Sequence, residues 1–87
     1  MHLNSLRSRI DRLDTKLLII LRRRFDIVEK LRSLKQKRGL PPEDRTREKE
    51  IFEELQKKSK ELHLNPGVVK KIFKIIIQES INLQKKK

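Results

Sequence analysis

The first half of this 87-residue chain carries one long run of apolar residues at helical spacing. Between residues 3 and 34 they recur every three or four positions, which indicates one face of a long amphipathic helix. We call this set the apolar seam: Leu3, Leu6, Ile10, Leu13, Leu17, Ile20, Ile27, Leu31 and Leu34. Arg24 interrupts it, and burying a guanidinium without a partner is costly. The pattern therefore predicts that an anion meets Arg24, either a carboxylate of the chain or one of a ligand.

The spacing predicts an all-α fold, a single domain spanning residues 1–87 that contains one long helix and two shorter ones. The long helix is expected over about residues 5–38. Asn4 or Ser5 is a candidate N-cap, and Gly39, followed by two prolines, is a typical stop signal.

Two further segments carry helix-start signals. A second helix is expected over about residues 44–62, with Asp44 as its candidate N-cap. A third is expected over about residues 66–85, because Asn65 is followed by proline at the first helical position. Its apolar residues again recur at helical spacing.

The length of the first helix predicts a second copy of the chain. A helix of about 34 residues is about 50 Å long, whereas a compact domain of this size has a radius of gyration of about 12 Å. The two shorter helices cannot cover the apolar seam along its whole length. We therefore expect an intertwined helical homodimer in which the long helices pack against each other.

Composition narrows the class of protein. The chain has no cysteine, its longest apolar run is too short for a membrane span, and its start lacks a secretory signal pattern. We therefore expect a cytoplasmic protein with no membrane contact. No His, Asp and Glu cluster has metal-ligand spacing, so no metal is expected. The net charge of +12 should attract anions, and the run 85–87 is expected to be a solvated tail.

Four polar side chains interrupt apolar faces. Arg24 and Lys35 differ by about 20° around the helix axis and are about 16 Å apart along it, so both can reach one small dianion. Ser80 and Gln84 extend the apolar stripe of the third helix. The alternatives are an internal ion pair for Arg24, a solvated Lys35, and a fraying helix end at Ser80 and Gln84.

Three other charged residues, Asp44, Glu48 and Arg7, each have a simple structural explanation. Asp44 as a cap and Glu48 in the first helical turn are both expected from helix-dipole electrostatics. Arg7 lies about 25 Å along the helix from Arg24, so within one chain it cannot reach the same small ligand. An antiparallel dimer can deliver Arg7 to the partner's site, although an exposed ion pair with Asp11 is an equal alternative.

Taken together, these residues resemble the AroQ-type chorismate mutases, an all-helical family of enzymes. The ordered set and its spacings carry the resemblance, which spans nearly the whole chain. The matching segments are residues 6–14, 16–18 and 22–24, Lys35, residues 44–48 and 75–80, and Gln84. The resemblance implies an intertwined dimer with two identical sites and the Claisen rearrangement of chorismate to prephenate, a step in the biosynthesis of phenylalanine and tyrosine. This reaction needs no cofactor.

The resemblance also implies roles for the cationic and amide side chains. Arg24 would hold one substrate carboxylate, and Arg7 from the other chain would also hold a carboxylate. Lys35 would bind a carboxylate and the ether oxygen of the substrate, and Gln84 would donate to the same ether oxygen. Together, Lys35 and Gln84 would stabilise the negative charge that grows on that oxygen.

The remaining roles concern the ring and the pocket wall. By the same resemblance, Glu48 and Asp44 would contact the ring hydroxyl of chorismate, and Ser80 would help at a carboxylate. Leu31 and Ile77 would form part of the apolar wall.

Two other functions are alternatives. An isochorismate-pyruvate lyase of the same fold holds its substrate with similar arginine and lysine side chains. The acidic group at Glu48 better suits the hydroxyl of chorismate and so favours the mutase. A non-enzymatic, basic helical dimer that binds nucleic acid fits the net charge. No nucleic acid is expected as a partner, however, because the chain has no set of aromatic residues for stacking and its unusual cations lie within apolar faces.

Overall fold

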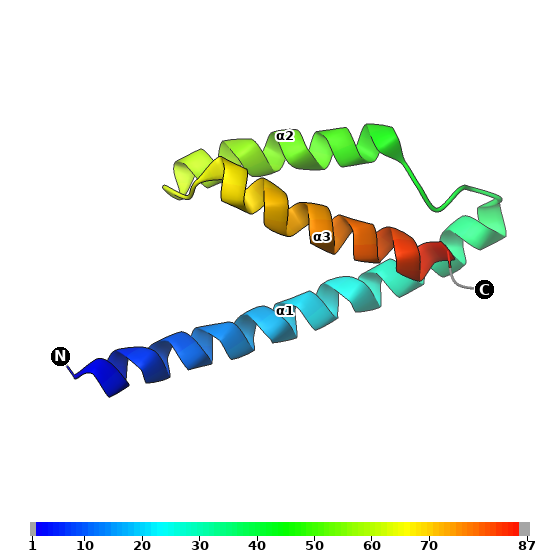
Figure 1. Ribbon diagram of the computed structural model, residues 1–87. Coiled ribbons are helices and arrows are strands. Elements are labelled where there is room, and N and C mark those ends of the chain that lie inside the picture. The colour runs from blue at the N-terminus through cyan, green and yellow to red at the C-terminus, as the bar shows by residue number, and fades with distance from the viewer. Residues whose placement is uncertain (1, 86–87) are drawn as a thin grey trace.

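The computed structural model describes residues 2–85, which form three α-helices and no strand. They are α1 (Leu3–Arg38), α2 (Arg45–Glu61) and α3 (Pro66–Lys85). The all-α prediction with one long and two shorter helices is confirmed. In Figure 1, α2 and α3 form an antiparallel hairpin, and α3 runs back towards the C-terminal half of α1. No helix in residues 2–85 is long and apolar enough to cross a membrane.

The first helix begins two residues earlier than expected, and the proposed caps are wrong. Asn4 and Ser5 lie inside α1, whereas His2 takes the extended N-cap conformation without a side-chain capping bond. The apolar seam already starts at Leu3, and the first turn closes when the Leu6 amide donates to the His2 carbonyl at 3.2 Å. Helical periodicity therefore outweighs the local preference of Asn and Ser for a cap.

The starts of the two shorter helices are confirmed. Asp44 Oδ1 accepts the backbone N–H of Arg47 at 3.0 Å, which makes Asp44 the N-cap of α2. Asn65 Oδ1 accepts the N–H groups of Gly67 at 2.9 Å and Val68 at 3.3 Å. These bonds satisfy amides that a helix start leaves without an internal partner.

Gly39 ends α1 in a left-handed conformation, with φ at 66°. Its N–H donates to the Gln36 carbonyl at 3.3 Å, and that of Leu40 donates to the Lys35 carbonyl at 2.8 Å. These bonds are typical of a glycine C-cap, and they turn the chain back towards α2.

Substitution of Gly39 by alanine is expected to lower the free energy of unfolding by about 1 kcal/mol. A Cβ at this position meets no atom within 4 Å, so the effect comes from backbone strain alone. Urea denaturation measures it, with Lys37→Ala on the exposed surface of α1 as the control. An unchanged midpoint for Gly39→Ala would contradict the assigned conformation.

The core of one chain is thin and centres on α3, against which α1 and α2 both pack without packing against each other. The buried apolar side chains are Val28 of α1 and Ile77 and Ile81 of α3. Among residues 2–85 no side chain is less than 2% exposed. A single chain therefore buries little of its apolar surface.

The N-terminal half of α1 is uncovered and extends beyond the hairpin (Figure 1). Ile10, Leu13 and Leu17 of the apolar seam are 55%, 57% and 64% exposed. The radius of gyration is 16.2 Å, well above the value of about 12 Å for a compact domain of this length. A contiguous apolar face of this kind is typical of a surface that another protein chain covers.

Candidate active site

A pocket of about 270 Å³ lies where all three helices and the α1–α2 loop meet. All the site residues predicted from the sequence line it except Arg7. The polar side chains in its wall are Arg24, Lys35, Asp44, Arg47, Glu48, Ser80 and Gln84. Leu31 and Ile77 belong to its apolar wall. The fold thus gathers residues that lie up to 60 positions apart in the sequence.

Arg24 is half-buried and has no acidic partner among the described residues. Its Nη1 donates to Ser80 Oγ at 2.5 Å. Burial lowers the pKa of Arg24 below its ordinary value, and the positive charge of Arg47 lowers it further. The guanidinium stays charged, since arginine does not lose its proton in proteins. Within residues 2–85 Arg24 therefore forms none of the internal ion pairs considered from the sequence, and it presents an uncompensated positive charge to the pocket.

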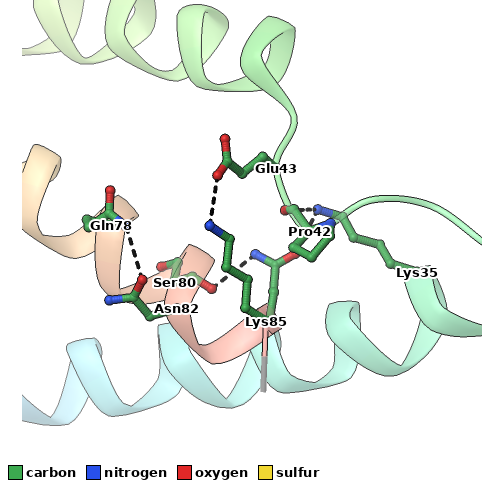
Figure 2. A network of polar contacts seen from close by, with 8 residues as sticks. Lys35, Pro42, Glu43, Gln78, Ser80, Asn82 and Lys85 are labelled. Carbon is green, nitrogen blue, oxygen red and sulfur yellow. Dashed lines mark hydrogen bonds and ion pairs between the residues drawn. The ribbon is translucent and has the colours of Figure 1, made fainter. Parts of the chain in front are cut away.

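Lys35 is held at the other end of the pocket by two neutral acceptors. Its Nζ donates to the Pro42 carbonyl at 2.9 Å and to Gln84 Oε1 at 2.7 Å. Figure 2 shows the ammonium directed at Pro42 of the loop. An ammonium has three donors, so one remains for a ligand. Lys35 is therefore part of the site wall and not a solvated surface lysine.

The polar residues of α3 are buried, which excludes a fraying helix end. Ser80 and Gln84 are 5% and 8% exposed. Ser80 Oγ accepts from Arg24 and donates to the Ile76 carbonyl at 2.8 Å. The Gln84 amide points its oxygen at Lys35, while Nε2 donates to the Ser80 carbonyl at 3.2 Å. One hydrogen of Nε2 is thus used within α3 and the second is left for a ligand.

The first turn of α2 supplies the acidic side of the pocket and one arginine that the sequence analysis missed. Asp44 and Glu48 both line the pocket, and Arg47 lies between them in sequence. The spacing of these three residues places them on one face of a helix start, and this signal would have identified Arg47. Its Nη1 also lies 3.5 Å from Glu50 in an exposed ion pair. No group of three or more His, Asp or Glu residues in the described chain is arranged to hold a metal.

Arg7 is exposed and does not line this pocket in a single chain. It lies in the uncovered half of α1, about 25 Å along the axis from Arg24. No motion of the Arg7 side chain can bridge that separation. A contribution of Arg7 to the same pocket requires a second chain.

A second cavity, of about 460 Å³, lies next to the first and is almost wholly apolar. Leu17 and Ile20 of α1, Leu55 of α2 and Phe73 of α3 line it, and Arg24 borders both cavities. The sequence analysis did not anticipate this cavity. Its position between the exposed part of α1 and the hairpin makes it a place where further apolar side chains can be buried.

Comparison with known proteins gives a family match over most of the chain. The family model described as chorismate mutase type II matches residues 6–85. A chorismate mutase of Methanocaldococcus jannaschii is 32% identical over 83 residues, which cover 95% of this chain and 84% of the relative.

Two bifunctional chorismate mutase/prephenate dehydratases are also similar. The protein of Buchnera aphidicola is 34% identical over 82 residues, and that of Aquifex aeolicus is 32% identical over 87 residues. These regions cover 94% and 97% of this chain but only 21% and 24% of the relatives. The chain thus spans between a fifth and a quarter of each bifunctional relative and most of the M. jannaschii protein.

Proposed function

The chain belongs to the type II chorismate mutase family and is an isomerase that converts chorismate to prephenate, and we propose that the pocket around Arg24 is where this reaction takes place. The observation that carries the proposal is a partly buried cationic pocket in which neither Arg24 nor Lys35 has an acidic partner among the described residues. In the rearrangement the ether C–O bond breaks while a C–C bond forms. No proton is transferred, so catalysis depends on positioning and electrostatics.

Arginine side chains are proposed to hold the two carboxylates of chorismate. After burial, the positive charge of Arg47 is the second cause that lowers the pKa of Arg24, and a bound dianion removes the repulsion between the two guanidinium groups. Ser80 fixes the Arg24 guanidinium through its hydroxyl oxygen. A guanidinium held in advance loses little freedom when it binds a carboxylate.

Lys35 and Gln84 are proposed to stabilise the ether oxygen as negative charge grows on it. The bond between Lys35 Nζ and Gln84 Oε1 keeps the two donor groups side by side. Each retains one hydrogen that is not used within the chain. Because Ser80 and Gln84 are buried, these donors act where charge is screened less than in bulk water.

Glu48 and Asp44 are proposed to contact the ring hydroxyl. Glu48 is partly buried in the pocket wall. An oxygen of Asp44 is already occupied by the Arg47 amide. Glu48 therefore has the greater free acceptor capacity and is the better candidate for the hydroxyl.

We further propose that two chains form an intertwined homodimer and that Arg7 reaches the site of the partner. The support is the uncovered apolar seam, the apolar cavity next to the site and the distance of Arg7 from its own pocket. Antiparallel α1 helices would cover the seam and carry each Arg7 towards the other chain's Arg24. A cytoplasmic location stays a prediction of the sequence.

Leu13→Asp is expected to convert the dimer to monomers, because it places a charge in the middle of the apolar seam. Sedimentation equilibrium should show a dissociation constant raised by at least about a hundredfold, equal to about 3 kcal/mol. Ser8→Asp is the matched control, since Ser8 lies about 140° away around α1. Equal dimer formation by both variants would contradict the packing of α1 on its partner.

Turnover by the purified protein tests the reaction, whereas variants of the pocket residues test where it takes place. We expect the ultraviolet absorbance of chorismate to fall, with prephenate identified by chromatography. Isochorismate, assayed in parallel, tests the lyase. Pyruvate release from isochorismate with chorismate recovered intact would overturn the proposal in favour of the lyase. Salt-dependent binding of nucleic acid without any turnover would favour the basic helical dimer.

A further inference from the structure

The loop between α1 and α2, residues 39–44, forms part of the pocket wall, and few contacts hold it in place. Pro42 and Asp44 of this loop line the pocket. The two helices that the loop joins pack against α3 but not against each other. The two ends of the loop are therefore positioned by helices that pack on α3, and the contacts of the loop itself decide where its middle, with Pro42 and Glu43, lies.

Two contacts join this loop to the end of α3. In the first, Lys35 Nζ connects the Pro42 carbonyl to Gln84 Oε1. In the second, the outer contact, Glu43 Oε1 lies 3.0 Å from Lys85 Nζ, and neither residue lines the pocket. Figure 2 shows both contacts bridging from the loop, one to Lys35 and the other to Lys85.

The partners of the outer contact are adjacent in sequence to site residues. Glu43 stands between Pro42 and Asp44, and Lys85 directly follows Gln84. Lys85 was expected to be part of a solvated tail, but it belongs to α3 and its ammonium has this specific partner. Lys86 and Lys87, the rest of the expected tail, lie outside the described residues.

We propose that Glu43 and Lys85 are positioning residues, whose ion pair latches the α1–α2 loop to the end of α3 and so sets the acceptors that orient Lys35. The inference rests on the proposed function of the pocket. When the latch is closed, the Pro42 carbonyl and the Gln84 amide hold the ammonium from two directions. When the loop moves away, Lys35 loses one acceptor and Asp44 loses its place at the start of α2.

The latch is weak, and this sets the size of the expected effect. The side chains of Lys85 and Glu43 are 53% and 42% exposed, and exposed ion pairs contribute little because water screens them. The hydrogen bond from Lys85 and its charge lower the pKa of Glu43, so the carboxylate is ionised and paired at neutral pH. Opening the latch reduces the fraction of binding-competent enzyme, which raises KM by about two- to fivefold. Bound substrate holds the loop closed, so kcat stays within about twofold.

Glu43→Gln separates the latch from a general effect of charge, because the two change KM in opposite directions. The substitution makes the protein more positive near a site for a dianion, which by itself attracts substrate and lowers KM. The latch predicts a higher KM. Glu54→Gln is the matched control, because Glu54 forms a similarly exposed ion pair with Lys58 and does not line the pocket. KM for the control should stay at the wild-type value or fall slightly.

Reversal of the pair tests the latch with the net charge unchanged. The double variant E43K/K85E should return KM to within about twofold of the wild-type value, because it restores the ion pair with opposite polarity. In 0.5 M salt the difference in KM between Glu43→Gln and the wild type should shrink, since the latch is exposed to solvent. A KM for Glu43→Gln that is equal to or below the wild-type KM, while the wild type turns over chorismate, would overturn the inference.

Hydrogen–deuterium exchange gives a readout that does not depend on turnover. The Arg47 amide is protected by Asp44 Oδ1, so an open latch should speed exchange at Arg47 in Glu43→Gln. The Val69 amide, which donates to the Asn65 carbonyl at the distant start of α3, serves as the internal reference. Unchanged exchange at Arg47 in Glu43→Gln would contradict the latch, whether or not the pocket is the active site. Faster exchange at Arg47, together with no turnover of chorismate by the wild type or any variant, would contradict the proposed site and leave the latch supported.

Discussion

Lys35→Ala is expected to lower kcat for chorismate by at least about a hundredfold, which corresponds to about 3 kcal/mol of transition-state stabilisation. Lys35 is the cationic donor proposed for the ether oxygen, where negative charge develops. The two neutral acceptors that hold its ammonium do not neutralise it. Alanine removes the charge from the pocket and leaves Gln84 as the sole donor proposed for that oxygen.

Steady-state kinetics with purified variants checks this expectation, with Lys30→Ala as the control. Lys30 is an exposed lysine of the same helix that does not line the pocket, so its loss should change kcat by less than about twofold. Circular dichroism and sedimentation should show unchanged helix content and assembly for both variants. Turnover by Lys35→Ala at the wild-type rate would exclude Lys35 from the catalytic site.

The features that the sequence predicted well are those fixed by periodicity and local capping. The predicted caps Asp44 and Asn65 are confirmed. Capping bonds join residues that are close in sequence, so they can be predicted without the tertiary structure. Arg24 and Ser80, which line one pocket, could be named as candidates because a polar residue within an apolar helix face is visible without any tertiary structure. Their direct contact follows from the packing of α3 on α1.

The features that the sequence did not predict depend on how distant segments meet. The spacing of Arg47 from Asp44 and Glu48 places it on the face of α2 that they share, but its proximity to Arg24 depends on the fold. Glu43 and Lys85 are 42 positions apart and belong to no periodic pattern, so nothing local signals their pairing. The direction of the Gln84 amide is likewise set by Lys35, because the residue type alone allows either end to face the pocket.

Mixing two inactive variants is expected to restore activity if Arg7 acts in trans. An Arg7→Ala homodimer lacks Arg7 in both sites, and an Arg24→Ala homodimer lacks Arg24 in both. In a heterodimer, the pocket of the Arg7→Ala chain keeps its own Arg24 and receives Arg7 from its partner, so one site is complete. Random pairing makes about half of the dimers heterodimers, which gives about a quarter of the wild-type activity.

The chains are unfolded together in denaturant, refolded and assayed with chorismate, and a tag on one chain allows the heterodimer to be isolated. The control mixes Arg24→Ala with Lys35→Ala. Arg24 and Lys35 line the same pocket of one chain, so each site in that heterodimer still lacks one of them and activity stays low. If the Arg7→Ala and Arg24→Ala mixture gains nothing over this control, the site does not draw Arg7 from a partner. If both mixtures recover equally, refolding and not complementation accounts for the gain.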